Sequence, residues 1–218
     1  MKFFLCALCA FSCCIVGQPL LMAEPPLSSE NPGLVSEIFL KRHSGKAYYP
    51  SIGIPKEQLW SLMESARWTP SSFNDQPWNF IFCDKALNPE AYKNALESLV
   101  GNQKWAKKAP MLIVVIARTK FTYNNLANEW AFYDTGAAAL AMSLQAADIG
   151  LMVHQIGGFD KQKIRQDFNL PADYEPVVVM TLGYEDMESS GEAAPRIRRP
   201  MDENFFMGSW GQWVESAS

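Results

Sequence analysis

Hydrophobic residues gather in a few continuous runs along the chain, and each run has the length of a β-strand. Residues 111–117 are apolar throughout, and residues 177–182 are apolar apart from Thr181. Such runs are typical of strands that are buried on both faces of a sheet. A third, largely apolar run at 78–82 predicts another strand, with Cys83 as a small residue at its end.

Apolar residues at helical spacing predict several helices around these strands. One helix covers residues 55–66, with Pro55 in its first turn. Another begins after Asn88 as the N-cap, and a short helix covers residues 161–168 after Asp160 as the N-cap. The apolar stripe of the second helix consists of Tyr92, Ala95, Leu96 and Leu99.

A long helical stretch at residues 125–149, ended by Gly150, lies between the two most apolar runs. Its centre, residues 136–141, is rich in small side chains, which let another helix approach closely. That helix could belong to the same protomer or to another subunit. Because helices alternate with strands and no glycine fingerprint follows the first strand, we predict a mixed α+β fold instead of a dinucleotide-binding doubly wound fold.

The first 34 residues differ in composition from the rest of the chain. Residues 1–23 hold one basic residue before an apolar run that is too short to span a membrane and resembles the core of a secretory signal. The alternatives are a membrane anchor and a mis-assigned start, with translation beginning at Met22. We expect export to the periplasm in the first case, membrane association only if the leader is retained, and a cytoplasmic protein in the last. Residues 24–34, rich in proline and serine, predict a flexible lead-in to one domain at 35–218.

Composition and charge narrow the possible chemistry. A pI near 5.3 and a net charge of −4 argue against a nucleic-acid binder. After the leader, Cys83 is the only cysteine, which excludes a disulfide framework within one mature chain. His43 and His154 are the only histidines, too few for a zinc site, and neither a Gly-x-Ser-x-Gly elbow nor a phosphate loop occurs. We therefore predict no metal site and no catalytic side chain, and assign the reactive chemistry to a bound organic cofactor.

Three polar segments, far apart in the sequence, carry the candidate binding residues. In the first, Arg42, Ser44 and Lys46 alternate, so in an extended backbone they point to one side. Two cations and a hydroxyl on one side suit a phosphate or a sugar chain. Taken alone, such a triplet is more typical of a solvated charged turn. The second segment, residues 70–78, is a polar, turn-rich run closed by Pro-Trp, and the third, residues 196–199, is a second arginine cluster.

These motifs resemble those of the nitroreductase family of FMN-dependent oxidoreductases. Arg-His-Ser-x-Lys-Ala with a following aromatic residue, at 42–48, is similar to the family's opening motif, and Pro-Ser-Ser-x-Asn-x-Gln-Pro-Trp, at 70–78, matches the second motif at every fixed position. Gln-Ile-Gly-Gly at 155–158 and Arg-x-Arg at 196–198 resemble segments that face the flavin and hold the phosphate. The resemblance implies FMN contacts from Arg42, His43, Ser44, Lys46, Pro70, Ser71, Ser72, Asn74, Gln76, Asn102, Ile156, Gly157, Gly158, Arg196 and Arg198.

The resemblance also implies an assembly. It predicts a central mixed or antiparallel sheet flanked by helices, in a homodimer with shared FMN sites. Pro70, Ser71, Ser72 and Asn74 would reach the flavin that is bound mainly by the other subunit. The tail at 205–213 is too apolar for a free end, and the alternatives are packing on itself and a dimer contact. In relatives such an extension wraps the partner subunit, so we expect a dimer contact there.

The activity implied by the resemblance has two halves. NAD(P)H reduces FMN by hydride transfer to flavin N5, and a flat acceptor such as a nitroaromatic or a quinone then takes the same place over the ring. The alternative is a flavin-binding electron-transfer or surface module with little turnover. Phe121, Tyr123 and residues 130–133 either shape the substrate cavity or pack ordinarily.

Overall fold

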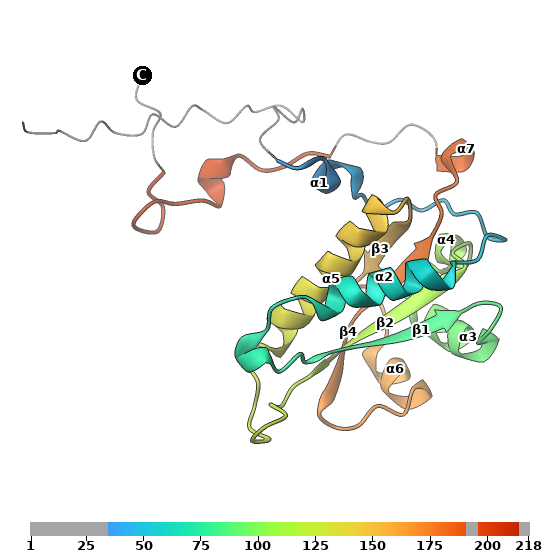
Figure 1. Cartoon of the computed structure of the whole chain (residues 1–218), viewed down its shortest axis with the longest axis horizontal. Coiled ribbons are helices and arrows are strands. Elements are labelled where there is room, and N and C mark those ends of the chain that lie inside the picture. The colour runs from blue at the N-terminus through green and yellow to red at the C-terminus, as the bar shows by residue number, and fades with distance from the viewer. Residues whose placement is uncertain (1–34, 191–195, 214–218) are drawn as a thin grey trace, which may run out of the picture. The chain divides into compact units, whose positions relative to one another are not determined.

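The computed structural model describes residues 35–190 and 196–213 (Figure 1). At its centre is a four-stranded sheet with the strand order β1-β2-β4-β3. The strands are β1 (Trp78–Asp84), β2 (Met111–Arg118), β3 (Met152–Ile156) and β4 (Tyr174–Gly183). Each neighbouring pair is antiparallel; Ile113 of the central strand β2, for example, lies opposite Phe82 and Met180. The predicted α+β class with a sheet of this kind is confirmed.

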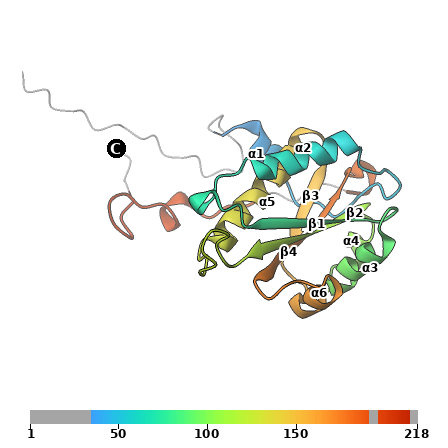
Figure 2. The same ribbon diagram turned by 60° about the horizontal axis from the view of Figure 1, so that its bottom comes forward.

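Helices cover both faces of the sheet, so the fold has three layers (Figure 2). One face is covered by α2 (Lys56–Arg67) and α5 (Ala131–Asp148), and the other by α3 (Pro89–Ser98), α4 (Gln103–Ala106) and α6 (Lys161–Asp167). Strand β2 serves both layers, because successive residues of a strand point to opposite faces. Met111, Ile113 and Val115 join the first core cluster, and Leu112, Val114 and Ile116 join the second. This double burial is why the run has no polar residue.

Two of the predicted N-caps differ in what their side chains do. The Asp160 carboxylate accepts hydrogen bonds from the backbone N–H groups of Gln162 and Lys163 and so caps α6 as predicted. Asn88 occupies the N-cap position of α3, but its side-chain oxygen accepts a hydrogen bond from the Asp84 N–H at 3.4 Å instead. Asn88 is therefore the N-cap residue by position, as predicted, but its amide closes the turn after β1 and makes no capping hydrogen bond.

The long helix α5 begins at Ala131, six residues later than predicted. Asn125 has a left-handed backbone with a φ of 60°, and the Phe121 N–H donates to the Leu126 carbonyl at 2.8 Å. A left-handed residue cannot continue into a right-handed helix, so this stretch forms a tight turn. The Asn128 side-chain oxygen then accepts the Trp130 N–H at 3.1 Å at the start of the helix.

The small residues at the centre of α5 pack against α2. Ala138, Ala139 and Ala146 are buried in the same cluster as Leu62 and Ala66 of α2. The close approach on this side of the helix therefore takes place within one protomer. Phe132, Tyr133, Gly136 and Leu140 lie on the exposed part of the same helix.

The remaining described elements are short. They are α1 (Glu37–Lys41), η1 (Ser72–Asn74), α7 (Met187–Ser190) and η2 (Met201–Glu203). Residues 196–213 belong to a separate unit, in which the rings of Phe206 and Trp210 lie 4.9 Å apart. The leader at 1–23 and the lead-in at 24–34 fall outside the described residues. Among the residues that the structure describes, no helix is both long and apolar enough for a membrane crossing.

Candidate functional site

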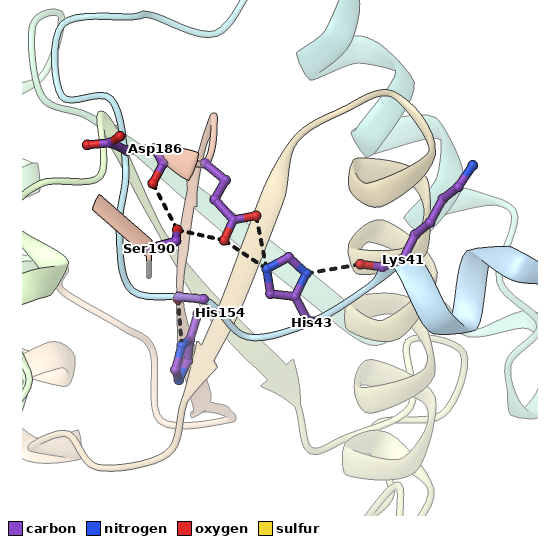
Figure 3. A network of polar contacts seen from close by, with 7 residues as sticks. Lys41, His43, His154, Asp186 and Ser190 are labelled. Carbon is purple, nitrogen blue, oxygen red and sulfur yellow. Dashed lines mark hydrogen bonds and ion pairs between the residues drawn. The ribbon is translucent and has the colours of Figure 1, made fainter. Parts of the chain in front are cut away.

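The first predicted segment follows α1 as a stretch of backbone without regular structure, and its alternate residues are anchored to the protein. The ring of His43 lies 3.0 Å from the Lys41 carbonyl through Nδ1 and 3.0 Å from Glu185 Oε1 through Nε2 (Figure 3). Glu185 stands just beyond the end of β4. Ser44 and Lys46, the neighbours in the alternation, are exposed.

Gly45 is fixed just as closely, and β3 provides the contacts. Its carbonyl accepts a hydrogen bond from His154 Nδ1 at 3.0 Å. A Cβ at Gly45 would lie 2.2 Å from the Met152 sulfur and 3.1 Å from Glu185 Oε1, so a side chain there would displace the Met152 thioether and crowd the carboxyl group. The segment is thus held by Glu185 through residue 43 and by β3 through residue 45, and it leaves Ser44 and Lys46 toward solvent.

A chain of contacts joins this segment to two other predicted parts of the site. The Lys46 ammonium lies 6.0 Å from the centre of the Trp105 ring, and the rings of Trp105 and His154 are 4.6 Å apart. Trp105 Nε1 donates to the Asn102 side-chain oxygen at 3.1 Å. A Cβ at Gly158 would lie 3.8 Å from Asn102 Nδ2. Three segments that are distant in sequence therefore meet along β3 and at the start of α4.

Asn102 has a structural role in this neighbourhood. Its Nδ2 donates to the Val100 carbonyl at 3.2 Å, and the Val100 N–H donates to the Gly158 carbonyl at 2.8 Å. The amide thereby ties α4 to the loop that follows β3. Gly157 is exposed, and a Cβ there would meet nothing within 4 Å, so the backbone of this loop is accessible to a ligand. Ile156, the last residue of β3, is buried in the core.

Burial controls the ionisation of His154. Its pKa lies below the usual value, first because the ring is partly buried, and the nearby charge of Lys46 adds to the lowering. The hydrogen bond to the Gly45 carbonyl acts in the opposite direction but does not compensate. A neutral ring suits this position, because it needs only the Nδ1–H to hold Gly45.

The second predicted segment, residues 70–76, has a strained backbone that its own side chains stabilise. Phe73, Asn74 and Gln76 have φ values of 53°, 53° and 50°, in the left-handed region. The Ser71 hydroxyl accepts the Gln76 N–H at 3.0 Å, and the Gln76 amide donates to the Asn74 carbonyl at 3.2 Å. Ser71 and Gln76 thus shape the loop, while Asn74 is exposed.

The second segment lies at the opposite end of α5 from the first. The Ser72 N–H donates to the buried carboxylate of Asp134, in the first turn of α5, at 2.9 Å. Arg42 and His43 line a pocket of about 170 Å³ together with Ala147, in the last turn. At 1.5 Å of rise per residue, these two ends of the helix are about 20 Å apart. One protomer therefore does not bring the two motifs together.

The third predicted cluster lies in the separate carboxy-terminal unit. Arg196 is half-buried and Arg198 is exposed, and Arg198 Nη1 donates to the Ile197 carbonyl at 3.0 Å. Arg199 pairs with Glu203 at 3.9 Å within the same unit. Contacts of Arg196 and Arg198 with a cofactor remain predictions.

The sequence reasoning missed several residues that organise the site. Glu185, His154 and Asp134 each hold a backbone group or side chain of a predicted binding segment, and Trp105 links two such segments. Glu185 could have been found from the sequence as an acidic residue two positions after the end of a buried strand. The sequence signal for Asp134 was weaker: it is an acidic residue on the buried side of an otherwise apolar helix.

Comparisons with known proteins agree with this arrangement. The sequence model described as the Nitroreductase family matches residues 40–184. YdgI of Bacillus subtilis, provisionally named an NAD(P)H nitroreductase, is 25% identical over 201 residues, which cover 76% of this chain and 93% of that protein.

Solved structures extend the agreement to the fold. A crystal structure of an oxidoreductase containing FMN is 28% identical with a TM-score of 0.77, and the match covers 88% of this chain and all of that one. An FMN-dependent nitroreductase from Clostridium difficile R20291 is 25% identical with a TM-score of 0.62, covering 79% and 98% of the two chains. Since the family model matches more than half of the sequence and the folds agree, this chain belongs to the nitroreductase family.

Proposed function

We propose that this protein is an FMN-dependent oxidoreductase that uses NAD(P)H to reduce flat acceptors such as nitroaromatics and quinones. One observation carries the proposal: the contacts through Trp105 and His154 bring the segments at 42–46, 102–105 and 156–158 into one neighbourhood. Two similar solved proteins are named for FMN. The names of the curated relatives support NAD(P)H as the reductant.

The groups present in this neighbourhood suit FMN. Arg42, Ser44 and Lys46 offer a guanidinium, a hydroxyl and an ammonium for the phosphate and the ribityl chain. The accessible backbone at Gly157 and Gly158 can approach the edge of a flavin ring, where N–H donors stabilise negative charge. When bound, FMN supplies the hydride acceptor and donor that the side chains lack.

We further propose that the site is completed by a second copy of the chain. The 70–76 segment is about 20 Å along α5 from the first motif, so its Asn74 would serve the flavin of a partner. Large aromatic side chains around this segment are exposed, with 77% of Trp68, 76% of Phe73 and 75% of Tyr133 accessible. Exposed apolar surface of this kind is typical of an interface.

The visible spectrum of purified protein tests the activity. We expect a yellow protein whose flavin absorbance bleaches when NADPH or NADH is added without oxygen and returns when a quinone is added. Bound flavin that neither nucleotide reduces would contradict the oxidoreductase and leave a flavin-binding module. A chain that takes up no added FMN would contradict the whole proposal.

Subunit mixing tests the shared site. Arg42→Ala and Asn74→Ala each damage both sites of a homodimer, but a mixed dimer has one site with both changes and one with neither. We expect two inactive preparations to regain activity after they are unfolded and refolded together. Arg67→Ala, an exposed arginine paired with Glu64 on α2, is the control and should keep its flavin. No recovery on mixing would contradict a site built from two subunits.

A further inference from the structure

We propose that Glu185 is a positioning residue of the cofactor site, which acts through His43 on the backbone of Arg42–Lys46. The inference rests on the proposed binding of FMN and goes beyond it by assigning a role to a residue outside the family motifs. Glu185 would not touch the cofactor. It would hold the segment in the shape that presents Arg42, Ser44 and Lys46 to a phosphate.

The His43 ring has a protein partner at each of its two nitrogens. A backbone carbonyl only accepts hydrogen bonds, so Nδ1 must carry a hydrogen for its contact with Lys41 at 3.0 Å. Nε2 lies 3.0 Å from both oxygens of Glu185. Nε2 and the Glu185 carboxyl group therefore form a hydrogen-bonded pair. Together the contacts with Lys41 and Glu185 fix the ring at both nitrogens, and with it the backbone on either side of residue 43 (Figure 3).

Glu185 is itself held in place. The Ser190 hydroxyl, at the end of α7, lies 2.9 Å from Glu185 Oε1 and 2.9 Å from the Asp186 carbonyl. The Glu185 side chain is 19% exposed and that of His43 is 37% exposed, so the pair is screened less by water than a surface ion pair. The strand end, the carboxylate, the imidazole and the binding segment therefore form one connected unit.

The same carboxylate also restricts the next anchor in the segment. A Cβ at Gly45 would lie 3.1 Å from Glu185 Oε1, on the side where β3 already supports Gly45. Glu185 thus lies next to residues 43 and 45, which face the protein, whereas Ser44 and Lys46 between and beside them are exposed. Moving it would loosen both anchors while leaving the exposed cofactor-binding side chains chemically intact.

A pair that acts as a unit has a distinct mutational signature. Removing Glu185 leaves His43 without its partner, and removing His43 leaves a half-buried carboxylate beside a site for a phosphate. Each loss disturbs the same segment, so the two effects should not add. Glu185→Gln keeps a hydrogen-bonding group of the same length opposite Nε2 and should preserve the geometry.

Dissociation constants for FMN, measured by quenching of flavin fluorescence, test the proposal. We expect Glu185→Ala to bind FMN about tenfold more weakly than wild type, the effect of one lost hydrogen bond. Glu185→Gln should stay within about threefold of wild type, and the double variant with His43→Ala should be no weaker than His43→Ala alone. Glu188→Ala, an exposed carboxylate on α7, is the matched control and should bind like wild type.

Several results would overturn the proposal. Wild-type affinity in Glu185→Ala would do so, as would a loss in Glu185→Gln as large as that in Glu185→Ala, or additive losses in the double variant. If Glu185→Ala does not fold, Ser190→Ala tests the proposal instead, because it removes the hydroxyl that orients the carboxylate. This variant should bind FMN about two- to threefold more weakly than wild type. An unchanged dissociation constant would refute the positioning role. A wild-type chain that binds no FMN would refute the proposed function itself, and with it this inference.

Discussion

Gly183, the last residue of β4, occupies a space that excludes even a methyl group. A Cβ there would lie 2.6 Å from Pro110 Cδ and 2.9 Å from Tyr48 Cδ1, although ordinary contacts begin at 3.4 Å. Neither neighbour can move easily. The Pro110 ring is bonded to its own backbone, and Tyr48 is 1% exposed with its hydroxyl 2.6 Å from the Thr181 hydroxyl.

The cost of Gly183→Ala follows from this geometry. Overpacking of a dense core by one methyl group costs about 1–3 kcal/mol. For a domain of this length, each kcal/mol lowers the unfolding temperature by about 2–4 °C, which gives a fall of about 2–12 °C. We also expect a higher dissociation constant for FMN. Gly183 lies two residues before Glu185 and packs against Tyr48, which follows the first binding motif.

Thermal unfolding followed by circular dichroism measures the effect, at one fixed protein concentration because assembly shifts the transition. Gly53→Ala is the matched control, since a Cβ there would meet nothing within 4 Å. The same methyl group should stabilise that loop by about 0.4–1 kcal/mol, because it restricts the unfolded chain. An unfolding temperature for Gly183→Ala equal to that of wild type, or above it, would refute the reasoning.

Three further predictions concern buried polar groups. Tyr48→Phe should lower the free energy of unfolding by about 1 kcal/mol in urea titrations, because the bond to Thr181 is lost; an unchanged midpoint would contradict this. Because burial lowers the pKa of His154 in the folded chain, the unfolded chain binds its proton more readily, and stability should fall as the pH drops below about 6.5. Urea titrations at several pH values should show a smaller fall in His154→Gln, and an equal fall would argue against this source. Burial raises the pKa of Cys83 to about 12, so iodoacetamide should label it slowly in the native protein and rapidly in denaturant, as followed by peptide mass spectrometry; rapid native labelling would show that the thiol is accessible.

The layers of the fold could be predicted wherever burial is uniform. The run at 111–117 is apolar because β2 has helices on both faces, and the pattern expresses this directly. The start of α5 could not be read in the same way. Its six preceding residues can join a helix by composition, and what prevents it is the left-handed turn at Asn125 together with the hydrogen bond from Trp130 to Asn128. Asn128 is also held from outside any local window, because its side-chain amide donates to the Asp75 carboxylate, 53 positions away, at 3.4 Å.

The candidate site could likewise be predicted from the sequence only in part. The alternation of residues 42–46 indicated a binding face, but the sequence did not reveal that the opposite face rests on β3 and Glu185. These contacts join residues 109 and 142 positions apart, so no local pattern records them. His43 was predicted with the cofactor-binding residues, whereas both of its ring nitrogens have protein partners. Whether it also touches the cofactor stays a prediction.

The left-handed backbone at Phe73, Asn74 and Gln76 bears on how this loop can evolve. Asparagine tolerates that conformation better than most residues, so selection for shape and selection for the amide favour the same residue at position 74. At positions 73 and 76 the two pressures oppose each other, because glycine would relax the backbone but remove the side chain. In a library randomised at positions 73 and 76, glycine should accumulate under selection for heat resistance and disappear under selection for turnover. The loop is therefore a place where robustness and activity compete residue by residue.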